Sequence, residues 1–302
     1  MRIAAVTGLY DVGRRQIDGR SVDDYIGWLN LTLRVPLPFL IFLDPAFDAS
    51  PIELKPDDRI VRVPRDDYFM FRQRAAIEAI CATSEHVNRR DIAFKLPNYG
   101  MLVMSKLEMM KRAASETDAD GLIWIDAGLS RFLPDLTGAV PRIDASQLQG
   151  LRVGVNATQH LTQHMRLGRL PRRMVGTCLT LVSGGDFYVA RNFAAELSDR
   201  LDFMVETEWL PNGRWDNEQV ALGCMLFRGG LPGAQILAKS IGWANVTRWL
   251  FGLPIHNRPI PAYVRWRFLV DEVRTLATPK ELCYLPGDFP NRQFEQRFQP
   301  AG

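Results

Sequence analysis

The sequence lacks the two features that direct proteins into membranes or out of the cell. No apolar run approaches the ~20 residues that a helix needs to cross a bilayer. No positively charged leader with a long apolar stretch opens the chain either, because residues 2–7 already have the pattern of a strand. We therefore expect a cytoplasmic protein, and the sequence leaves open a peripheral contact with the inner membrane.

Cysteine is scarce as well. The chain of 302 residues has 4 cysteines, which lie far apart in apolar surroundings: Cys81, Cys178, Cys224 and Cys283. Spacing of this kind fits neither a disulfide framework nor a zinc cluster. We expect buried, reduced thiols and a reducing compartment.

A strong excess of one charge is also missing. The 37 Lys and Arg residues nearly balance the 34 Asp and Glu residues, which gives a formal net charge of +3 and a pI near 8.7. This excess is too weak to predict a nucleic-acid partner, although a phosphate-bearing small ligand remains compatible. Hydrophobic residues at 47% and charged residues at 24% are typical of a folded, soluble enzyme.

Short apolar runs alternate with segments of helical spacing along the chain. The pattern predicts strands at 3–9, 39–43, 60–63, 121–125, 151–155, 178–183 and 187–190. It predicts a turn at 96–100 and helices at 22–34, 72–84, 101–115, 192–204, 217–228 and 235–250. Ser21, followed three residues later by Asp24, indicates the cap of the first helix. Together these elements predict an α/β fold with a mostly parallel sheet and helices on both faces.

The proline-rich stretch 253–261 is the one boundary that the sequence suggests. It divides the chain into a main domain over 1–253 and a C-terminal arm over 254–302. Around this boundary aromatic residues are interleaved with arginines: Trp243, Trp249, Phe251, Tyr263, Trp266 and Phe268 among Arg248, Arg258, Arg265 and Arg267. The pattern suits a membrane surface or an anionic acceptor. It also fits a domain edge whose arginine stems lie along apolar surface.

Aspartates follow three of the predicted strands. Ligands of open α/β sheets bind beyond the carboxyl ends of the strands, which makes Asp11, Asp44 and Asp126 candidates. A strand-end aspartate taken singly often only closes a turn or caps a helix. Asp126 differs because Ala127 and Gly128 let a ligand approach the backbone, and because its strand is too apolar to tolerate an idle charge. A carboxylate there suits Mg²⁺ or Mn²⁺, which would bridge the pyrophosphate of a nucleotide.

A second acidic group precedes an apolar helix face. Asp216 and Glu218 either complement the positive end of the helix dipole or provide a base for the proton of an acceptor hydroxyl. Their neighbour Trp215 is placed to stack on the face of a sugar.

Glycines and cations supply further candidates. Gly184 and Gly185 lie between two strands, where the backbone passes close to a ligand or forms a bulge. Arg14, Lys106 and Arg131 lie in or beside the loops already named, where they either bind phosphates or are ordinary surface charges.

The histidines point less clearly to chemistry. His160 and His164 share a helix face, but Leu161 stands where a metalloprotease helix needs glutamate, so we favour a structural pair over a zinc site. His256, in a turn, is a candidate for a late metal or phosphate ligand.

Three segments, 6–14, 124–128 and 216–219, resemble the HtrL/YibB-like bacterial proteins, which are linked to surface polysaccharide assembly. The resemblance lies in order and spacing over residues 3–228. More loosely, the layout looks like the GT-A glycosyltransferases, which implies a Rossmann-like nucleotide-binding half, a nucleotide-sugar donor and Mn²⁺ or Mg²⁺. The Asp-x-Asp metal motif of that group is here Asp126-Ala127-Gly128, with one acid missing, so metal dependence stays open.

The resemblance also implies roles for individual residues. It places Thr7 and Asp11 near the nucleoside and Asp126 at the metal and the pyrophosphate. It places the glycine pair beside the sugar, and Asp216 or Glu218 near the acceptor.

These observations predict a glycosyltransferase that moves a sugar from a nucleotide-sugar donor to a surface glycan or glycolipid, such as lipopolysaccharide or capsule. Residues 1–253 would then form the nucleotide-sugar-binding catalytic domain. The alternatives are a nucleotidyltransferase or phosphohydrolase that uses the same strand-end acids, and a non-catalytic polysaccharide assembly factor that works through its C-terminal arm.

Overall fold

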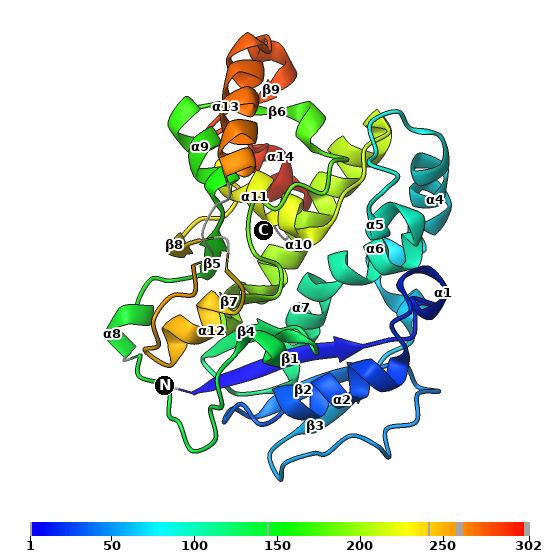
Figure 1. The fold of residues 1–302 in the computed structure, drawn as a ribbon, viewed down its shortest axis with the longest axis vertical. Helices are drawn as coiled ribbons and strands as arrows, with labels where there is room; N and C mark the ends of the chain where they lie inside the picture. Colours follow the sequence, from blue (N-terminus) through cyan, green and yellow to red (C-terminus); the bar gives the residue numbers. More distant parts are fainter. Residues whose placement is uncertain (1, 144, 241, 258–261, 299–302) are drawn as a thin grey trace.

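A computed structural model describes residues 2–143, 145–240, 242–257 and 262–298. Its centre is a seven-stranded sheet in the order β3-β2-β1-β4-β7-β5-β8 (Figure 1). The strands are β1 Ile3–Leu9, β2 Phe39–Leu43, β3 Arg59–Arg62, β4 Gly121–Ile125, β5 Val153–Ala157, β7 Asp186–Ala190 and β8 Ala234–Lys239. A small second sheet pairs β6 Leu170–Pro171 with β9 Cys283–Tyr284.

Six of the seven strands of the main sheet run in the same direction. β1 is parallel to both β2 and β4, and β2 is parallel to β3. β7 runs antiparallel to β4 and β5, while β5 and β8 are parallel. The predicted mostly parallel sheet is therefore confirmed, with one antiparallel strand inserted between β4 and β5.

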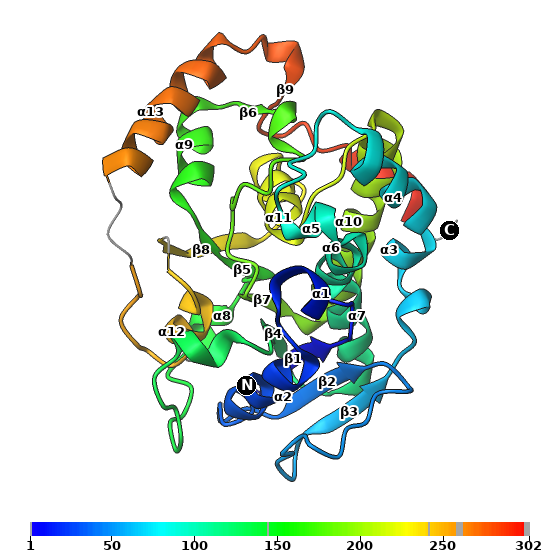
Figure 2. The same ribbon diagram turned by 45° about the vertical axis from the view of Figure 1, so that its right-hand side comes forward.

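Helices cover both faces of this sheet, as predicted (Figure 2). They are α1 Arg15–Asp18, α2 Val22–Thr32, α3 Phe69–Arg72, α4 Arg74–Thr83, α5 Ile92–Lys95, α6 Pro97–Met104, α7 Lys106–Glu116, α8 Ala145–Leu148, α9 Gln159–Leu167, α10 Ala194–Met204, α11 Glu218–Phe227, α12 Asn245–Leu250, α13 Ala262–Ala277 and α14 Asn291–Phe298. Successive side chains of β4 point to opposite faces. Trp124 accordingly joins the core beneath α7, α10 and α11, whereas Ile123 and Ile125 join the core beneath α2 and α12.

Several local predictions from the sequence agree with the structure. The capping box at Ser21 and Asp24 is present in full, and the helix that it opens ends at Thr32. The four cysteines are free, as predicted, with Cys81, Cys224 and Cys283 buried and Cys178 half-buried.

Three local predictions were wrong. The segment 178–183 forms no strand and makes only an isolated bridge between Val182 and Ala157. The predicted helix 235–250 is strand β8 followed by the short helix α12, because a brief apolar run does not distinguish the two structures. The predicted turn at 96–100 is the start of α6, where Pro97 occupies a position that tolerates a missing N–H.

The segment after residue 261 packs against the body of the protein. β9 pairs with β6, and the ring of Phe294 in α14 lies 5.8 Å from that of Phe203 in α10. The predicted boundary at 253–261 lies partly outside the described residues, since 258–261 are not described. The division at residue 253 stays a prediction. None of the described helices has the length and apolar character that a membrane span requires.

Close packing around β4 gives a stability prediction. A Cβ added at Gly121 would lie 2.5 Å from atoms of the Tyr188 ring, whereas one added at Gly27 in α2 would meet nothing within 4 Å. We expect Gly121→Ala to lower the free energy of unfolding by about 1–3 kcal/mol. The control Gly27→Ala should raise it by about 0.5–1 kcal/mol, because alanine favours the helix. Urea unfolding measures both, and equal stabilities of wild type and Gly121→Ala would contradict the packing described.

Candidate active site

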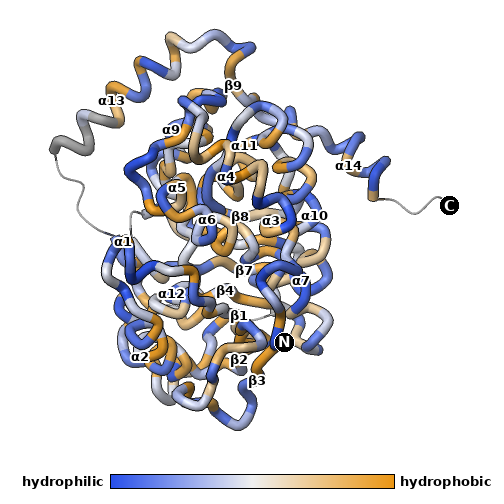
Figure 3. Tube along the Cα trace, turned by 90° about the vertical axis from the view of Figure 1, so that its right-hand side faces the viewer, coloured by the Kyte–Doolittle hydropathy of each residue, from blue (hydrophilic) through white to orange (hydrophobic). Residues whose placement is uncertain are grey.

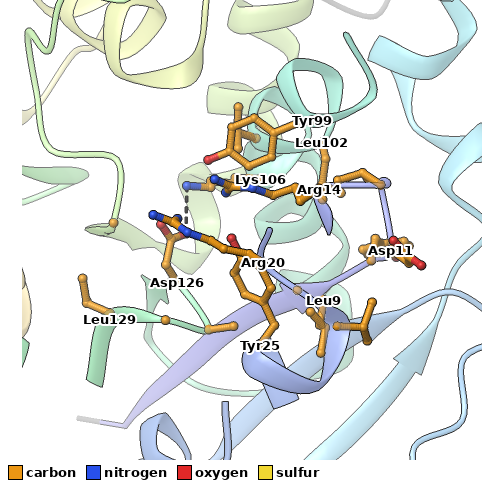
Figure 4. A pocket seen from close by; sticks show the side chains of 18 of the residues that line it. Leu9, Asp11, Arg14, Arg20, Tyr25, Tyr99, Leu102, Lys106, Asp126 and Leu129 are labelled. Atoms are coloured by element: carbon orange, nitrogen blue, oxygen red, sulfur yellow. Dashed lines mark ion pairs between the residues drawn. The ribbon is translucent and has the colours of Figure 1, made fainter. Parts of the chain in front are cut away.

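A cleft of about 560 Å³ opens at the carboxyl ends of β1 and β4. Its volume lies within the range of pockets that bind nucleotides and other small molecules. It is lined by the loop after β1, by α2, α6 and α7, and by the loop after β4. Figure 4 shows the side chains that face it, including Leu9, Asp11, Arg14, Arg20, Tyr25, Tyr99, Leu102, Lys106, Asp126 and Leu129.

Asp126 stands at the centre of this cleft. Its backbone N–H donates to the Gly185 carbonyl at 2.8 Å, which extends the pairing of β4 with β7 by one residue. Its Oδ1 accepts from Trp124 Nε1 at 2.6 Å and lies 2.8 Å from Lys106 Nζ. The side chain is 39% exposed, and the described residues provide no hydrogen bond to Oδ2. One carboxylate oxygen is therefore fixed, and the other is free to meet a ligand.

Lys106 joins Asp126 to a second acid. Its Nζ lies 2.7 Å from Glu218 Oε1 and donates to the Gly184 carbonyl at 2.9 Å, so its three hydrogens have three acceptors. The side chains of Lys106 and Glu218 are 6% and 3% exposed. The sequence left open whether Lys106 is a surface charge. The structure shows instead a buried cation between two carboxylates.

The electrostatics of this group follow from burial and pairing. Burial by itself would lower the pKa of Lys106, but the carboxylates of Asp126 and Glu218 outweigh it and hold that pKa above its ordinary value. Burial raises the pKa of Glu218, and Lys106 opposes the rise. Lys106 is therefore a permanent positive charge in the floor of the cleft.

Gly184 and Gly185, both predicted to lie near a ligand, have different roles in the structure. A Cβ at Gly184 would come within 2.1 Å of Glu218 Oε1, so this glycine makes room for the buried ion pair. Gly185 lines the cleft, and a Cβ there would lie 3.8 Å from Asp126 Oδ2. Gly128 lines the cleft on the other side of Asp126. A ligand can thus approach the backbone closely at Gly185 and Gly128.

Cations and aromatic rings form the walls. The Arg14 guanidinium pairs with Asp18 and lies 4.4 Å from the centre of the Tyr99 ring. The Arg131 guanidinium lies 4.1 Å from the centre of the Trp28 ring, and its Nε donates to the Gly128 carbonyl at 2.9 Å. Figure 4 shows the Arg14, Arg20 and Lys106 side chains pointing towards the side of the cleft where Asp126 lies.

Of the two residues predicted to lie near the nucleoside, Asp11 lines the cleft and Thr7 is buried in the strand before it. Asp11 lines the cleft and accepts from the Gly13 N–H at 2.9 Å, in a loop where Gly13 has a φ of 82° that favours glycine. Thr7 is fully buried within β1 and does not line the cleft. Its Oγ1 has no hydrogen-bond partner among the described residues.

Asp216 lies outside the cleft and stabilises a neighbouring loop. Its Oδ2 accepts from the backbone N–H groups of Gly176 at 2.7 Å and Cys178 at 3.2 Å. The adjacent Asn217, not Asp216, caps α11. The side chain of Trp215 is fully buried in the core, so the suggestion that it stacks on a sugar was wrong. Of the second acidic group, Glu218 alone reaches the site, from below Lys106.

The histidines are not part of the cleft. His256 does not line it, and its backbone exchanges hydrogen bonds with the Asn245 side chain. His160 packs on Phe268 with 4.4 Å between ring centres, and burial lowers its pKa to about 4. His164 Nδ1 lies 3.1 Å from the Arg169 carbonyl. His160 is thus packed against an aromatic ring, and His164 is hydrogen-bonded within the protein.

The described side chains around Asp126 form no cluster of three or more metal ligands. Within the described ranges, no group of three or more His, Cys, Asp or Glu is arranged to hold a metal ion. Asp126 offers one free oxygen, and the ammonium of Lys106 occupies the space beside its other oxygen. A Mn²⁺ or Mg²⁺ ion that arrives with the phosphates of a ligand stays a prediction.

Sequence reasoning missed several residues that line the cleft. Tyr25 lines the cleft, but in the sequence it looks like an ordinary apolar position of the helix at 22–34. Tyr99 lines it too, but it lies in the predicted turn at 96–100. Arg20 gave no local signal, because a loop arginine resembles any surface charge. The aromatic Trp243, assigned to the region near the arm, in fact lines this cleft and stacks on Phe132 with 5.6 Å between ring centres.

Comparison with known proteins adds a weak structural likeness. No protein-family model and no curated protein matches the chain, so its resemblance to the HtrL/YibB-like proteins is not confirmed. The structure of mannosyl-3-phosphoglycerate synthase from Rubrobacter xylanophilus is similar at 16% identity and a TM-score of 0.34, covering 100% of this chain and 77% of that one. Mouse xyloside xylosyltransferase 1, in its apo form, is similar at 9% identity and a TM-score of 0.41, covering 86% of this chain and 100% of that one. Values this low support neither an activity nor a site.

The buried ion pair predicts a stability cost. Lys106→Met leaves Glu218 without its counter-charge, and we expect the free energy of unfolding to fall by about 3–5 kcal/mol at neutral pH. Adding Glu218→Gln should restore part of this loss, because the uncompensated charge is then gone. The loss of stability in Lys106→Met should shrink in acid, because protonation of Glu218 removes the same uncompensated charge. Urea unfolding at several pH values tests this, and a deficit independent of both pH and Glu218 would contradict it.

Asp216 predicts a second pH effect. Burial raises the pKa of its carboxyl from 3.8 to about 7, against the lowering effect of the N–H groups that it accepts from. The folded state therefore favours the protonated form, and this contribution to stability is lost as the pH rises from about 4 through about 7. The free energy of unfolding of wild type, relative to Asp216→Asn, should accordingly decrease over that window. The exposed Asp118→Asn serves as the control, and parallel curves for wild type and Asp216→Asn would refute the assignment.

Proposed function

We propose that the protein is a glycosyltransferase that takes a sugar from a nucleoside-diphosphate donor held in the cleft around Asp126. The observation that carries the proposal is a carboxylate at the end of the central strand whose free oxygen faces a cationic, aromatic cleft. Open α/β sheets bind their ligands beyond the carboxyl ends of such strands. The acceptor would be a surface glycan or a glycolipid.

The lining of the cleft suits each part of such a donor. Arg14, Arg15, Arg20 and Arg131 provide guanidinium groups for a pyrophosphate. The ring of Tyr25 offers a surface for a base or a sugar, whereas the Arg14 guanidinium already covers one face of Tyr99. Backbone made accessible by glycine lies next to the free carboxylate oxygen. Acid, cations and rings thus occur together where the chain can approach a bulky ligand.

The reaction needs charge stabilisation at one place above all. The acceptor hydroxyl oxygen bonds to the anomeric carbon while the bond from that carbon to the diphosphate oxygen breaks, and the nucleoside diphosphate leaves with the electron pair. Negative charge then grows on the diphosphate, where the guanidinium groups that line the cleft supply positive charge. The hydroxyl proton must go to a base, and Asp126 Oδ2 is the oxygen of the ion-pair group that is free to accept it.

The same geometry disfavours the other enzymatic alternatives. Nucleotidyl transfer and phosphate hydrolysis commonly rely on metal ions held between clustered carboxylates. Glu218 is buried behind Lys106, and Asp216 lies outside the cleft, so Asp126 does not gather such a cluster within the described residues. Lys106 pairs with Asp126 from below and leaves Oδ2 as the oxygen of that acid that faces a ligand.

A binding and transfer experiment tests the proposal. UDP, GDP, CDP and CMP, each with and without Mn²⁺ or Mg²⁺, are screened for an increase in Tm, because a ligand that binds the folded state stabilises it. With the donor so identified, Asp126→Asn should reduce sugar transfer at least about a hundredfold while leaving the unfolding midpoint nearly unchanged.

Asp44→Asn is the matched control, because Asp44 also ends a strand but does not line the cleft. It should transfer sugar like wild type. Stabilisation by none of these nucleotides, or full activity of Asp126→Asn, would refute the proposed function. Release of pyrophosphate from nucleotide sugars would favour a nucleotidyltransferase instead.

A further inference from the structure

Helix α13 carries an apolar stripe that faces away from the protein. Trp266, Leu269, Val273 and Leu276 are 67%, 56%, 67% and 53% exposed. Their spacing of three, four and three residues places them on one face of the helix. The views agree that α13 lies at the outer edge of the molecule (Figure 3). Four large apolar side chains in a row on an exposed helix are more than the scattered exposure that any protein surface shows.

The opposite face of α13 is fixed to α9. Phe268 and Thr275 are 7% and 1% exposed, and Gln163 Nε2 donates to the Phe268 carbonyl at 2.8 Å. The ring of His160 lies against Phe268. Because this face is packed and bonded to α9, the stripe on the other face points away from the body of the protein.

Each described charged side chain of α13 is paired or lies off the apolar stripe. Glu272 accepts from Arg166 Nη2 at 2.7 Å, on the side towards α9. Asp271 is half-buried, and helical spacing places it on the face opposite to the stripe. Arg274 is exposed but lies off the stripe, because no stripe residue is three or four positions from it. Beside the stripe, the described part of the helix therefore carries one acid, Glu272, whose charge is paired with Arg166.

A group of arginines continues this surface at the C-terminal end of α13. Arg169 Nη1 donates to the last turn of the helix at 3.3 Å. Arg172, Arg173 and Arg214 line a hollow of about 310 Å³ together with Thr278, which directly follows the helix. Arg172 and Arg173 are exposed, and the described residues give neither an ion-pair partner.

The acid in this hollow does not neutralise it. Glu208 is paired with Arg228 Nη1 at 2.9 Å. The hollow thus presents guanidinium groups with free donors, which bind phosphate oxygens well.

We propose that the stripe on α13 and the arginine hollow beside it form one docking face for a membrane surface with anionic headgroups. The apolar stripe enters the boundary between headgroups and acyl chains, and the arginines meet lipid phosphates. Binding needs both parts, because each alone gives only weak attachment. A second copy of the chain fits less well, because it would cover the stripe without supplying the phosphate oxygens that suit the guanidinium groups of Arg172 and Arg173.

This face differs from the aromatic and arginine pattern seen in the sequence. Of those aromatic residues, Phe251 and Phe268 are buried, and Trp243 lines the cleft. The exposed stripe is mostly aliphatic, with Trp266 as its aromatic member. The inference is independent of the reaction proposed above, since none of its residues lines the cleft.

Flotation of the full chain with vesicles tests this proposal. We expect binding to vesicles of phosphatidylcholine mixed with phosphatidylglycerol, weak binding to phosphatidylcholine alone, and loss of binding as salt rises. Leu269→Ser/Val273→Ser and Arg172→Gln/Arg173→Gln should each lower the partition coefficient about tenfold. Exposed residues elsewhere provide matched controls, Leu54→Ser/Val140→Ser and Arg89→Gln/Arg90→Gln, and these should bind like wild type.

Three results would overturn the proposal. The first is no binding of wild type to the anionic vesicles. The second is equal binding by the α13 or arginine variants and their controls. The third is a dimer, seen by light scattering, that Leu269→Ser/Val273→Ser dissolves, since a second copy of the chain would then cover the stripe. Circular dichroism of each variant checks that these surface changes leave the fold intact.

Discussion

One buried ammonium group determines how the cleft is built. Lys106 lies between the carboxylates of Asp126 and Glu218 and also bonds the Gly184 carbonyl. A buried charge is tolerated only when it is paired and hydrogen-bonded. These contacts therefore fix the positions of four segments that are distant in the sequence relative to one another. Of the two carboxylates, Glu218 is buried and Asp126 keeps one oxygen towards the cleft. The requirement to pair a buried charge thus decides which acid meets a ligand.

The rest of the site is arranged around this group. The antiparallel strand β7 follows directly on Gly185, whose carbonyl accepts from the Asp126 N–H. The helix that carries Lys106 packs on one face of the sheet together with Tyr99, whereas Tyr25 packs on the other face, and arginines from the loops line the cleft between them. A ligand in the cleft therefore meets cations from several elements but one free carboxylate oxygen at its floor. Such an arrangement favours a ligand that carries phosphate, which the cations bind, and a polar group, which the carboxylate oxygen orients.

Much of this framework could be predicted from the sequence, and the reasons are local. The apolar run before Asp126 and the small residues after it identified the end of the central strand, and Ser21 with Asp24 identified a helix start. What could not be predicted depends on partners far along the chain. Glu218 meets Lys106 across 112 positions, and Asp216 meets Gly176 across 40, so neither role has a local signature. The direction of β7 depends on its neighbours in the same way.

The most direct test of the central claim is a crystal structure of the protein with a bound nucleoside diphosphate. We predict phosphates in contact with the guanidinium groups of Arg14 or Arg131, with Asp126 Oδ2 facing the open cleft beside the diphosphate and Lys106 still paired below it. A diphosphate bound elsewhere on the protein, with Asp126 turned into the neighbouring loop and shut off from the cleft, would contradict it.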